Sequence, residues 1–226
     1  PEFGARLRED LILKGKISTA ETAPYDLEQA IGVDMLLSFV GWANSYYQKG
    51  EVYTDEWGIG WQSVEHQTDF GSGRYTEPVI HPLADDARIQ SYTPPDPQRS
   101  ELYQAARNTV QDFKDEYWIV GAVVCTIFET AWALRGLEKT FKDFVKNRDL
   151  LQDLFQIPYQ YHLSAAKKLV EMGVDMIWIG DDVGAQEQML ISPADWRFFL
   201  KPLLASFIKE LKDINYKLAL VITVLL

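Results

Sequence analysis

An apolar run that ends in two adjacent aspartates is the feature that most constrains how this chain folds. The run, at residues 174–179, shows no regular alternation of polar and apolar side chains. Such a run is typical of a strand buried on both faces, and therefore of a parallel sheet covered by helices. Asp181 and Asp182 follow at its C-terminal end. Active sites of (β/α)8 barrels lie at that end of their strands, so we expect these carboxylates to line a site.

The residues after this pair predict the start of a helix. Ser192 is suited to cap it, and Pro193 falls at the first helical position, where its missing N–H costs nothing. Asp195 lies in the first turn, near the positive end of the helix dipole. We therefore expect a helix over residues 193–211.

Similar patterns predict strands and helices in alternation along the chain. We expect buried strands at residues 33–40, 117–125, 174–179 and 216–226, and helices at 98–116, 127–135, 137–146, 149–172 and 193–211. Pro158 is expected to kink or divide the fourth helix. Residues 46–81 differ, since they are rich in Gly, Tyr, Trp, Thr and Asp and predict a twisted hairpin inserted on one face. The alternation indicates the α/β class with a parallel sheet.

Composition and charge exclude several classes of function. With 226 residues the chain is long enough for one sizeable core, and we interpret residues 1–226 as a single domain. Its formal net charge of −11 would repel a phosphate backbone, so no binding to nucleic acid is expected. It has neither a membrane-spanning apolar stretch nor the apolar core of a signal peptide. Its one cysteine, Cys125, excludes an internal disulfide framework and fits a reducing, cytoplasmic location.

Four segments resemble the uroporphyrinogen decarboxylase (URO-D) superfamily, which also contains corrinoid-linked methyltransferases. In the family's order they read AIGVDMLLSFV at residues 30–40, YTDEWGIGW at 53–61, GAVVCTIFETAWALRG at 121–136 and GVDMIWIGDDVGAQEQMLISPADWRFFLKP at 173–202. The resemblance extends over about residues 24–215, and the aspartate pair after the middle strand is similar to the methyltransferase-like branch. It implies a (β/α)8, TIM-barrel-type fold.

Measured against that fold, the chain is expected to be a partial barrel. A complete barrel usually takes about 250 residues and eight strands, and the patterns here predict only four parallel strands. The family's N-terminal strand, with its arginine-containing loop, has no counterpart in residues 1–23, and the C-terminal strands would follow residue 226. We therefore expect an open sheet edge through which copies of the chain could pair into a homo-oligomer.

The resemblance leaves three functions open. The first, our working hypothesis, is corrinoid-linked methyl transfer in one-carbon metabolism, with a small-molecule substrate and a corrinoid protein as partner. The second is decarboxylation of a porphyrinogen-like tetrapyrrole, but the strand end that carries the decarboxylase aspartate reads SFVGW here, with Val40 or Gly41 in its place. The third is an inactive barrel fragment that serves as an interaction module through its open edge.

The resemblance also implies cofactors for the full-length protein. The methyltransferases use zinc and a corrinoid, and their zinc is held by a histidine and cysteines of the later strands. Those strands lie beyond residue 226, so we expect no metal ligand within this chain. His66, His81 and His162 lie far apart and match no zinc pattern, which favours structural roles. Cys125 is interpreted as a small buried hydrophobe.

Asp181 and Asp182 are the predicted catalytic residues. Two adjacent carboxylates repel each other, which raises the pKa of at least one of them and suits a proton donor, a metal contact or a hold on a polar substrate. The alternative is that one aspartate caps the loop amides around Gly184 while the other faces solvent.

The predicted substrate-binding residues are Glu56, Trp57, Glu129 and Gln186. In one interpretation, the Trp57 ring stacks on a flat ligand and Glu56 binds the polar edge of that ligand. In the other, Trp57 and Trp61 pin the hairpin to the barrel while the neighbouring acids stay solvated. Glu129 begins a helix, where it either faces the site or complements the dipole. Gln186 lies in the loop after the aspartate pair.

Overall fold

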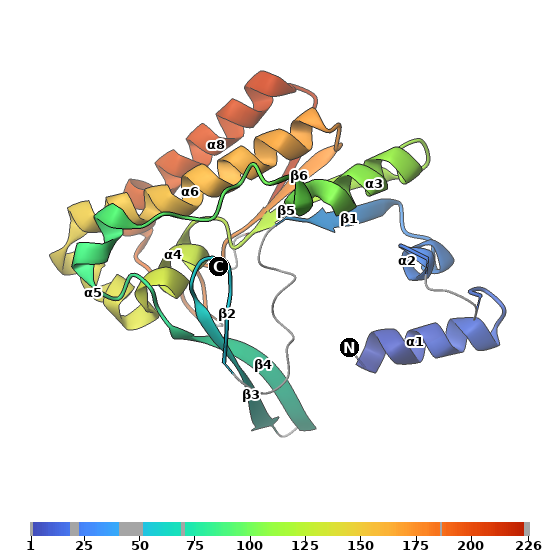
Figure 1. The fold of residues 1–226 in the computed structure, drawn as a ribbon, viewed down its shortest axis with the longest axis horizontal. Coiled ribbons are helices and arrows are strands. Elements are labelled where there is room, and N and C mark those ends of the chain that lie inside the picture. The colour runs from blue at the N-terminus through green and yellow to red at the C-terminus, as the bar shows by residue number, and fades with distance from the viewer. Residues whose placement is uncertain (1, 19–22, 41–51, 69–70, 186, 224–226) are drawn as a thin grey trace.

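A four-stranded parallel sheet forms the centre of this computed structural model, which describes residues 2–18, 23–40, 52–68, 71–185 and 187–223 (Figure 1). Each strand pairs with its neighbour in parallel register, in the order β1, β5, β6, β7. The strands are β1 (Met35–Phe39), β5 (Trp118–Val124), β6 (Met176–Gly180) and β7 (Ala219–Thr223). All four lie where apolar runs predicted strands, so the α/β class with a parallel sheet is confirmed.

Three helices cover one face of this sheet (Figure 1). They are α3 (Gln104–Phe113), α6 (Arg148–Glu171) and α8 (Lys201–Ile214). The packing of α6 on β5 is tight at Gly121, where an added Cβ would lie 2.9 Å from the Leu169 side chain. This approach explains a glycine in the middle of a buried strand, because any larger residue would displace the Leu169 side chain. None of the helices in the described ranges combines the length and hydropathy of a membrane span.

The expected barrel is not confirmed. In the described residues the sheet stays open, with β1 and β7 at its two edges. A barrel closes only when every strand is paired on both sides, and the neighbouring strands that this requires are not among the four.

Helix α6 contradicts part of the prediction for Pro158. The helix runs through 24 residues without interruption, with Pro158 inside it. A proline removes one backbone donor, but a helix whose apolar side chains are packed on both halves tolerates that loss. Gly173 ends the helix as predicted, with φ of 93°, a left-handed conformation that glycine adopts without strain.

The helix predicted over residues 193–211 begins as expected but is not uniform. The Ser192 hydroxyl accepts a hydrogen bond from the Asp195 N–H at 3.0 Å, and Pro193 occupies the first position. The segment then passes through α7 (Pro193–Asp195) and a π-helical turn, η4 (Trp196–Leu200), before α8. Such a turn inserts one residue into the helical register, a feature that apolar spacing alone does not predict.

A second, antiparallel sheet forms an arm beside the ends of the parallel strands (Figure 1). It consists of β2 (Tyr53–Thr54), β3 (Gly60–Thr68) and β4 (Gly71–Ile80), in that order. The antiparallel pairing expected of this region is thus present; whether the segment is an insertion on a barrel face stays a prediction.

The remaining described elements are helical. They are the helices α1 (Glu2–Leu13), α2 (Asp26–Ile31), α4 (Phe128–Arg135) and α5 (Leu137–Lys146), and the 3-10 helices η2 (Asp86–Ser91) and η3 (Ser100–Tyr103). Arg135, at the end of α4, is completely buried and donates to Asp143 at 2.8 Å and to Asp86 at 2.7 Å. It thereby joins α4 to α5 and η2.

Candidate active site

The C-terminal ends of β5 and β6 lie side by side, with Val124 in register with Gly180. The residues that follow these strands are Cys125 and Asp181, so the parallel register brings two distant segments to one edge of the sheet. The Thr126 N–H closes the junction by donating to the carbonyl of Gly180 at 3.0 Å. This edge is where polar side chains of the two segments meet.

Asp181 is buried and anchors the start of α4. One carboxylate oxygen accepts hydrogen bonds from the N–H groups of Ile127 at 3.1 Å and Phe128 at 2.7 Å, and the other accepts from Glu129 at 2.9 Å. Helix N-termini carry unsatisfied N–H groups and partial positive charge, which the carboxylate neutralises. Burial nevertheless raises the pKa of Asp181 to about 6, against the opposing effect of these three amides. The capping alternative is therefore close to the observed geometry, but the capped amides belong to residues 127–129 rather than to the loop around Gly184.

Glu129, in the first turn of α4, is the second carboxyl at this edge with a raised pKa. One of its oxygens accepts a hydrogen bond from the N–H of Asp182 at 3.1 Å, and the Cys125 thiol also donates to its carboxyl. Burial, and then the charge of Asp181, raise the pKa of Glu129 to about 7. A carboxyl with such a pKa is both protonated and ionised near neutral pH, which suits proton transfer.

Asp182 and Gln186 are less defined by the structure. Asp182 is partly exposed and, in the described ranges, forms no ion pair. Its loop is closed by hydrogen bonds from Leu190 to Val183 at 2.8 Å and from Ala185 to Gln188 at 2.7 Å. Gln186 lies outside the described residues, so its predicted role stays a prediction.

Glu56 and Trp57 lie in a separate loop, residues 55–59, which we call the Asp55 loop. Asp55 holds it together, accepting from the N–H groups of Trp57 at 2.8 Å and Ile59 at 2.9 Å and from Trp61 Nε1 at 2.7 Å. The Trp61 hydrogen bond lies within the hairpin, so the pinning of the hairpin to a barrel stays a prediction. Asp55 is not the solvated acid that the same interpretation assumed. Glu56 pairs with Arg99 and accepts from the Tyr161 hydroxyl at 3.3 Å.

Trp57 itself is buried, with 1% of its surface exposed. Its ring packs edge-on against Tyr161, with centroids 4.6 Å apart, and stacks near His162 at 6.0 Å. In this conformation the ring offers no open face for a flat ligand. The structure therefore gathers Asp181, Asp182 and Glu129 at one edge of the sheet. Glu56 and Trp57 are not part of this group and contact residues of α6 instead.

Two contact residues were not singled out by sequence reasoning: Tyr161 and Arg99, which hold Glu56. The interpretation of Cys125 as a small buried hydrophobe is wrong, because Cys125 is partly exposed and its thiol contacts the Glu129 carboxyl. The one signal available for the contact between Cys125 and Glu129 was their spacing: they are four residues apart, one at a strand end and the other at a helix start. In the described part of the chain, no three His, Cys, Asp or Glu side chains are grouped so that they could hold a metal ion.

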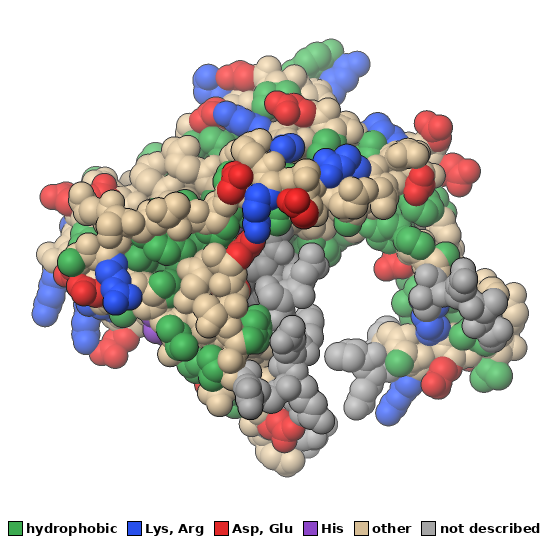
Figure 2. Space-filling view, viewed as in Figure 1, with side chains coloured by type: hydrophobic (Ala, Val, Ile, Leu, Met, Phe, Trp, Pro, Cys, Tyr) green, Lys and Arg blue, Asp and Glu red, His purple; other side chains and the backbone are tan. Residues whose placement is uncertain are grey.

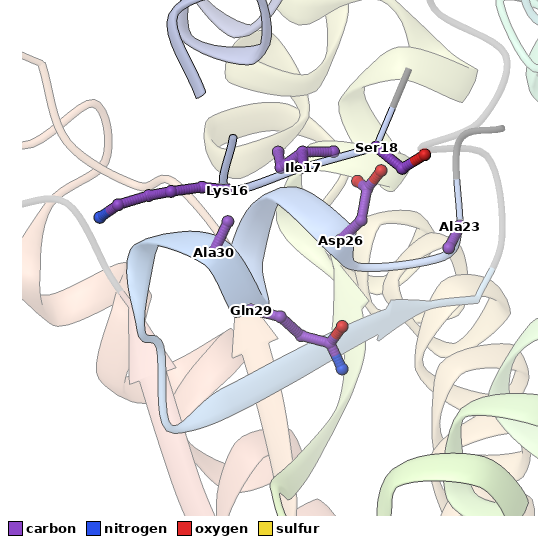
Figure 3. Close-up of a pocket in the computed structure, with 7 residues that line it drawn as sticks. All are labelled: Lys16, Ile17, Ser18, Ala23, Asp26, Gln29 and Ala30. Carbon is purple, nitrogen blue, oxygen red and sulfur yellow. The ribbon is translucent and has the colours of Figure 1, made fainter. Parts of the chain in front are cut away.

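A hollow lies beside α2, lined by residues of α2 and of the segments that precede it (Figure 3). Asp26 and Lys16 are among its lining residues (Figure 3). The Asp26 carboxylate is already engaged by Arg8, through hydrogen bonds of 2.7 Å and 2.5 Å. We assign this hollow no chemical role.

Comparison with known proteins decides the family. The sequence profile of the family described as uroporphyrinogen decarboxylase (URO-D) matches residues 63–223, more than two thirds of the chain. The chain belongs to the URO-D family. The match includes β5, α4 and β6, and therefore Asp181, Asp182 and Glu129. No curated protein matches the sequence.

Among solved structures, the URO-D chain is similar to a methyltransferase from Methanosarcina mazei. The TM-score is 0.55 and the sequences are 22% identical, over 75% of this chain and 47% of the methyltransferase. This similarity shows a shared fold. The URO-D chain thus spans about half the length of the methyltransferase it matches.

Proposed function

We propose that this URO-D chain belongs to the methyltransferase-like branch and takes part in transferring a methyl group from a corrinoid-bearing partner protein to a small-molecule acceptor. The observation that carries the proposal is Glu129, a carboxyl fixed at the strand ends with a pKa of about 7. The fold shared with the Methanosarcina mazei methyltransferase supports the same branch.

The proposed chemistry assigns a proton to Glu129. A corrinoid, when bound by the partner, supplies the methyl group as a methyl cation equivalent. An acceptor that carries an ionisable hydrogen must release a proton as its new bond to carbon forms. Glu129, when ionised, takes that proton, while the N–H of Asp182 keeps its carboxylate in place. Asp182 is proposed to contact the acceptor, and Asp181 acts as a positioning residue through α4.

Zinc does not fit the described residues. The acceptor-activating zinc of the branch needs three or four His, Cys or carboxylate ligands, and the described side chains form no such group. No step of the proposal therefore passes through a metal held by the described residues.

Decarboxylation of a porphyrinogen remains the alternative reaction, and electrostatics disfavour it. Porphyrinogen substrates carry several carboxylates and need cationic partners. At the strand ends described here, Asp181, Asp182 and Glu129 make no ion pair, and the N-terminal amides of α4 are already occupied by Asp181. Figure 2 likewise shows acidic and basic side chains interspersed on the visible face, without a basic patch.

A non-enzymatic role has one supporting observation. β7 is an edge strand in the described residues, and Val221 and Ile222 on it are each 39% exposed. An apolar edge strand can pair with a second copy of the chain. A monomer in sedimentation at micromolar concentrations would contradict this role, and a dimer lost on Val221→Lys would support it.

The enzymatic proposal is tested by assaying the purified protein with methylcobalamin as donor and a simple thiol as acceptor. We expect methyl transfer that Glu129→Gln lowers at least tenfold and that Glu138→Gln, an exposed control on α5, leaves unchanged. Decarboxylation of uroporphyrinogen in place of methyl transfer would overturn the proposal.

A further inference from the structure

Cys125 leads from β5 toward α4 in an unusual backbone conformation. Its φ is 57°, in the left-handed region that residues other than glycine seldom occupy. A residue with a β-carbon is strained there, and such a conformation persists only where the surrounding contacts hold it. Because the Cys125 thiol donates to the carboxyl of Glu129, the contacts that hold this backbone also determine a contact of the candidate active site.

Two threonine hydroxyls bind carbonyl groups in this turn. Thr130 Oγ1 donates to the carbonyl oxygen of Cys125 at 2.6 Å, and Thr126 Oγ1 donates to that of Val123 at 2.6 Å. Both threonines are buried, with 1% or less of their surface exposed, so water does not compete for these carbonyls. Of the two hydroxyls, that of Thr130 binds the left-handed residue itself.

Consecutive residues of α4 therefore contact Cys125 at two points. Glu129 accepts from its thiol, and the hydroxyl of Thr130 donates to its carbonyl oxygen. Valine has nearly the shape of threonine but no donor, so packing alone does not explain a threonine at position 130.

We propose that Thr130 is a positioning residue, which holds Cys125 in its left-handed conformation and thereby keeps the thiol against the Glu129 carboxyl. The inference rests on the proposed function, in which Glu129 takes the proton of the acceptor. A donor that binds a carboxylate favours its ionised form, which is the form that accepts this proton. Thr130 thus adjusts the proton affinity of Glu129 without contacting a substrate.

The other groups that act on Glu129 do not depend on Thr130. The charges of Asp181 and Asp182 raise the pKa of Glu129, and the hydrogen bond from the Asp182 N–H lowers it. A threonine hydroxyl has one hydrogen to donate, and that of Thr130 goes to Cys125. The effects of both aspartates should therefore persist when the Thr130 hydroxyl is removed.

Carbon-13 NMR of the Glu129 carboxyl group tests the proposal without an assay of activity. Thr130→Val should raise the proton-binding constant of Glu129 about threefold, because the thiol, a weak donor, is released. Thr130→Ser keeps the hydroxyl and should leave the constant unchanged. Cys125→Ala should raise it by the same factor as Thr130→Val, and combining the two substitutions should add nothing further.

Thr140→Val on α5 is the matched control. Thr140 is also buried, and its hydroxyl donates to the carbonyl oxygen of Gly136 at 3.0 Å. This variant should lose stability as Thr130→Val does, but it should leave the pKa of Glu129 unchanged. A shift of that pKa in Thr140→Val equal to that in Thr130→Val would overturn the proposal.

Two further outcomes would contradict the role of Thr130. One is an unchanged Glu129 pKa in folded Thr130→Val, and the other is a further rise when that substitution is added to Cys125→Ala. An unchanged pKa in Cys125→Ala would overturn the proposal as well, which keeps the test decisive even where Thr130→Val does not fold. Absence of methyl transfer in the wild type contradicts the proposed function, whereas the pKa of Glu129 decides the role of Thr130.

Discussion

The carboxylate of Glu129 accepts a hydrogen bond from the backbone N–H of Asp182 at 3.1 Å, across 53 residues of sequence. In return, the N–H of Glu129 donates to the carboxylate of Asp181 at 2.9 Å. The two segments therefore exchange hydrogen bonds, and each carboxylate is oriented by the backbone of the other strand end. Mutations here should separate residues that hold the edge together from residues that do chemistry.

Asp181→Asn should destabilise the fold. An asparagine side chain has one acceptor oxygen and turns its amide donors toward N–H groups, so the amides of residues 127–129 lose partners. We expect the free energy of unfolding in urea to fall by about 2–3 kcal/mol. Asp182→Asn, whose side chain is partly exposed, is the control and should change it by less than about 0.5 kcal/mol. Equal losses in both variants would contradict the anchoring role of Asp181.

Glu129 should make stability depend on pH. Its pKa rises from 4.5 in a model peptide to about 7 in the fold, so the folded chain binds this proton more tightly than the unfolded chain. Its contribution to stability is therefore complete below about pH 4.5 and is lost as the pH rises through about 7.

Glu129→Gln mimics the protonated form and removes this dependence. Between pH 5 and pH 8, the unfolding free energy of the wild type should fall relative to that of the variant by roughly 2 kcal/mol, after allowance for partial exposure. Urea titrations at several pH values measure the difference. A constant difference across this range would show that Glu129 titrates normally.

His162 should act in the opposite direction. Its pKa is lowered from 6.5 to about 4, so the folded chain binds this proton more weakly than the unfolded chain. The contribution of His162 to stability is therefore complete above about pH 6.5 and is lost as the pH falls toward 4. Relative to His162→Phe, the wild type should lose about 3 kcal/mol between pH 7 and pH 4. Trp57→Phe keeps the imidazole and should retain this pH dependence, which thermal melts across the range would reveal.

Arg135→Met should be among the most destabilising substitutions. Arg135 is completely buried, and its loss leaves the buried carboxylate of Asp143 without its cation. Removing one partner of a buried ion pair costs about 3–5 kcal/mol. Lys142→Met breaks an exposed pair with Glu138 and should cost about 0.5 kcal/mol or less. Similar midpoints of chemical unfolding for the two variants would refute the structural importance of Arg135.

Local sequence signals were sufficient for the elements and for the family. The apolar runs, the Ser192 cap and Gly173 each act over a few neighbouring residues, and the strands and helix ends that they predict are present. The π-helical turn at Trp196–Leu200 and the continuity of α6 through Pro158 were not predicted, because both depend on packing against other elements.

The sequence by itself determined that the chain forms a parallel α/β sheet of the URO-D family with two aspartates at a strand end. Only the tertiary structure decided how these acids differ: Asp181 turns inward onto the amides of α4, and Glu129 becomes the carboxyl with the pKa near neutrality. It likewise buried Trp57 against His162 instead of opening it to a ligand. The physical reason is that burial, hydrogen-bond partners and neighbouring charge are set by residues 50 or more positions away, which no local pattern encodes.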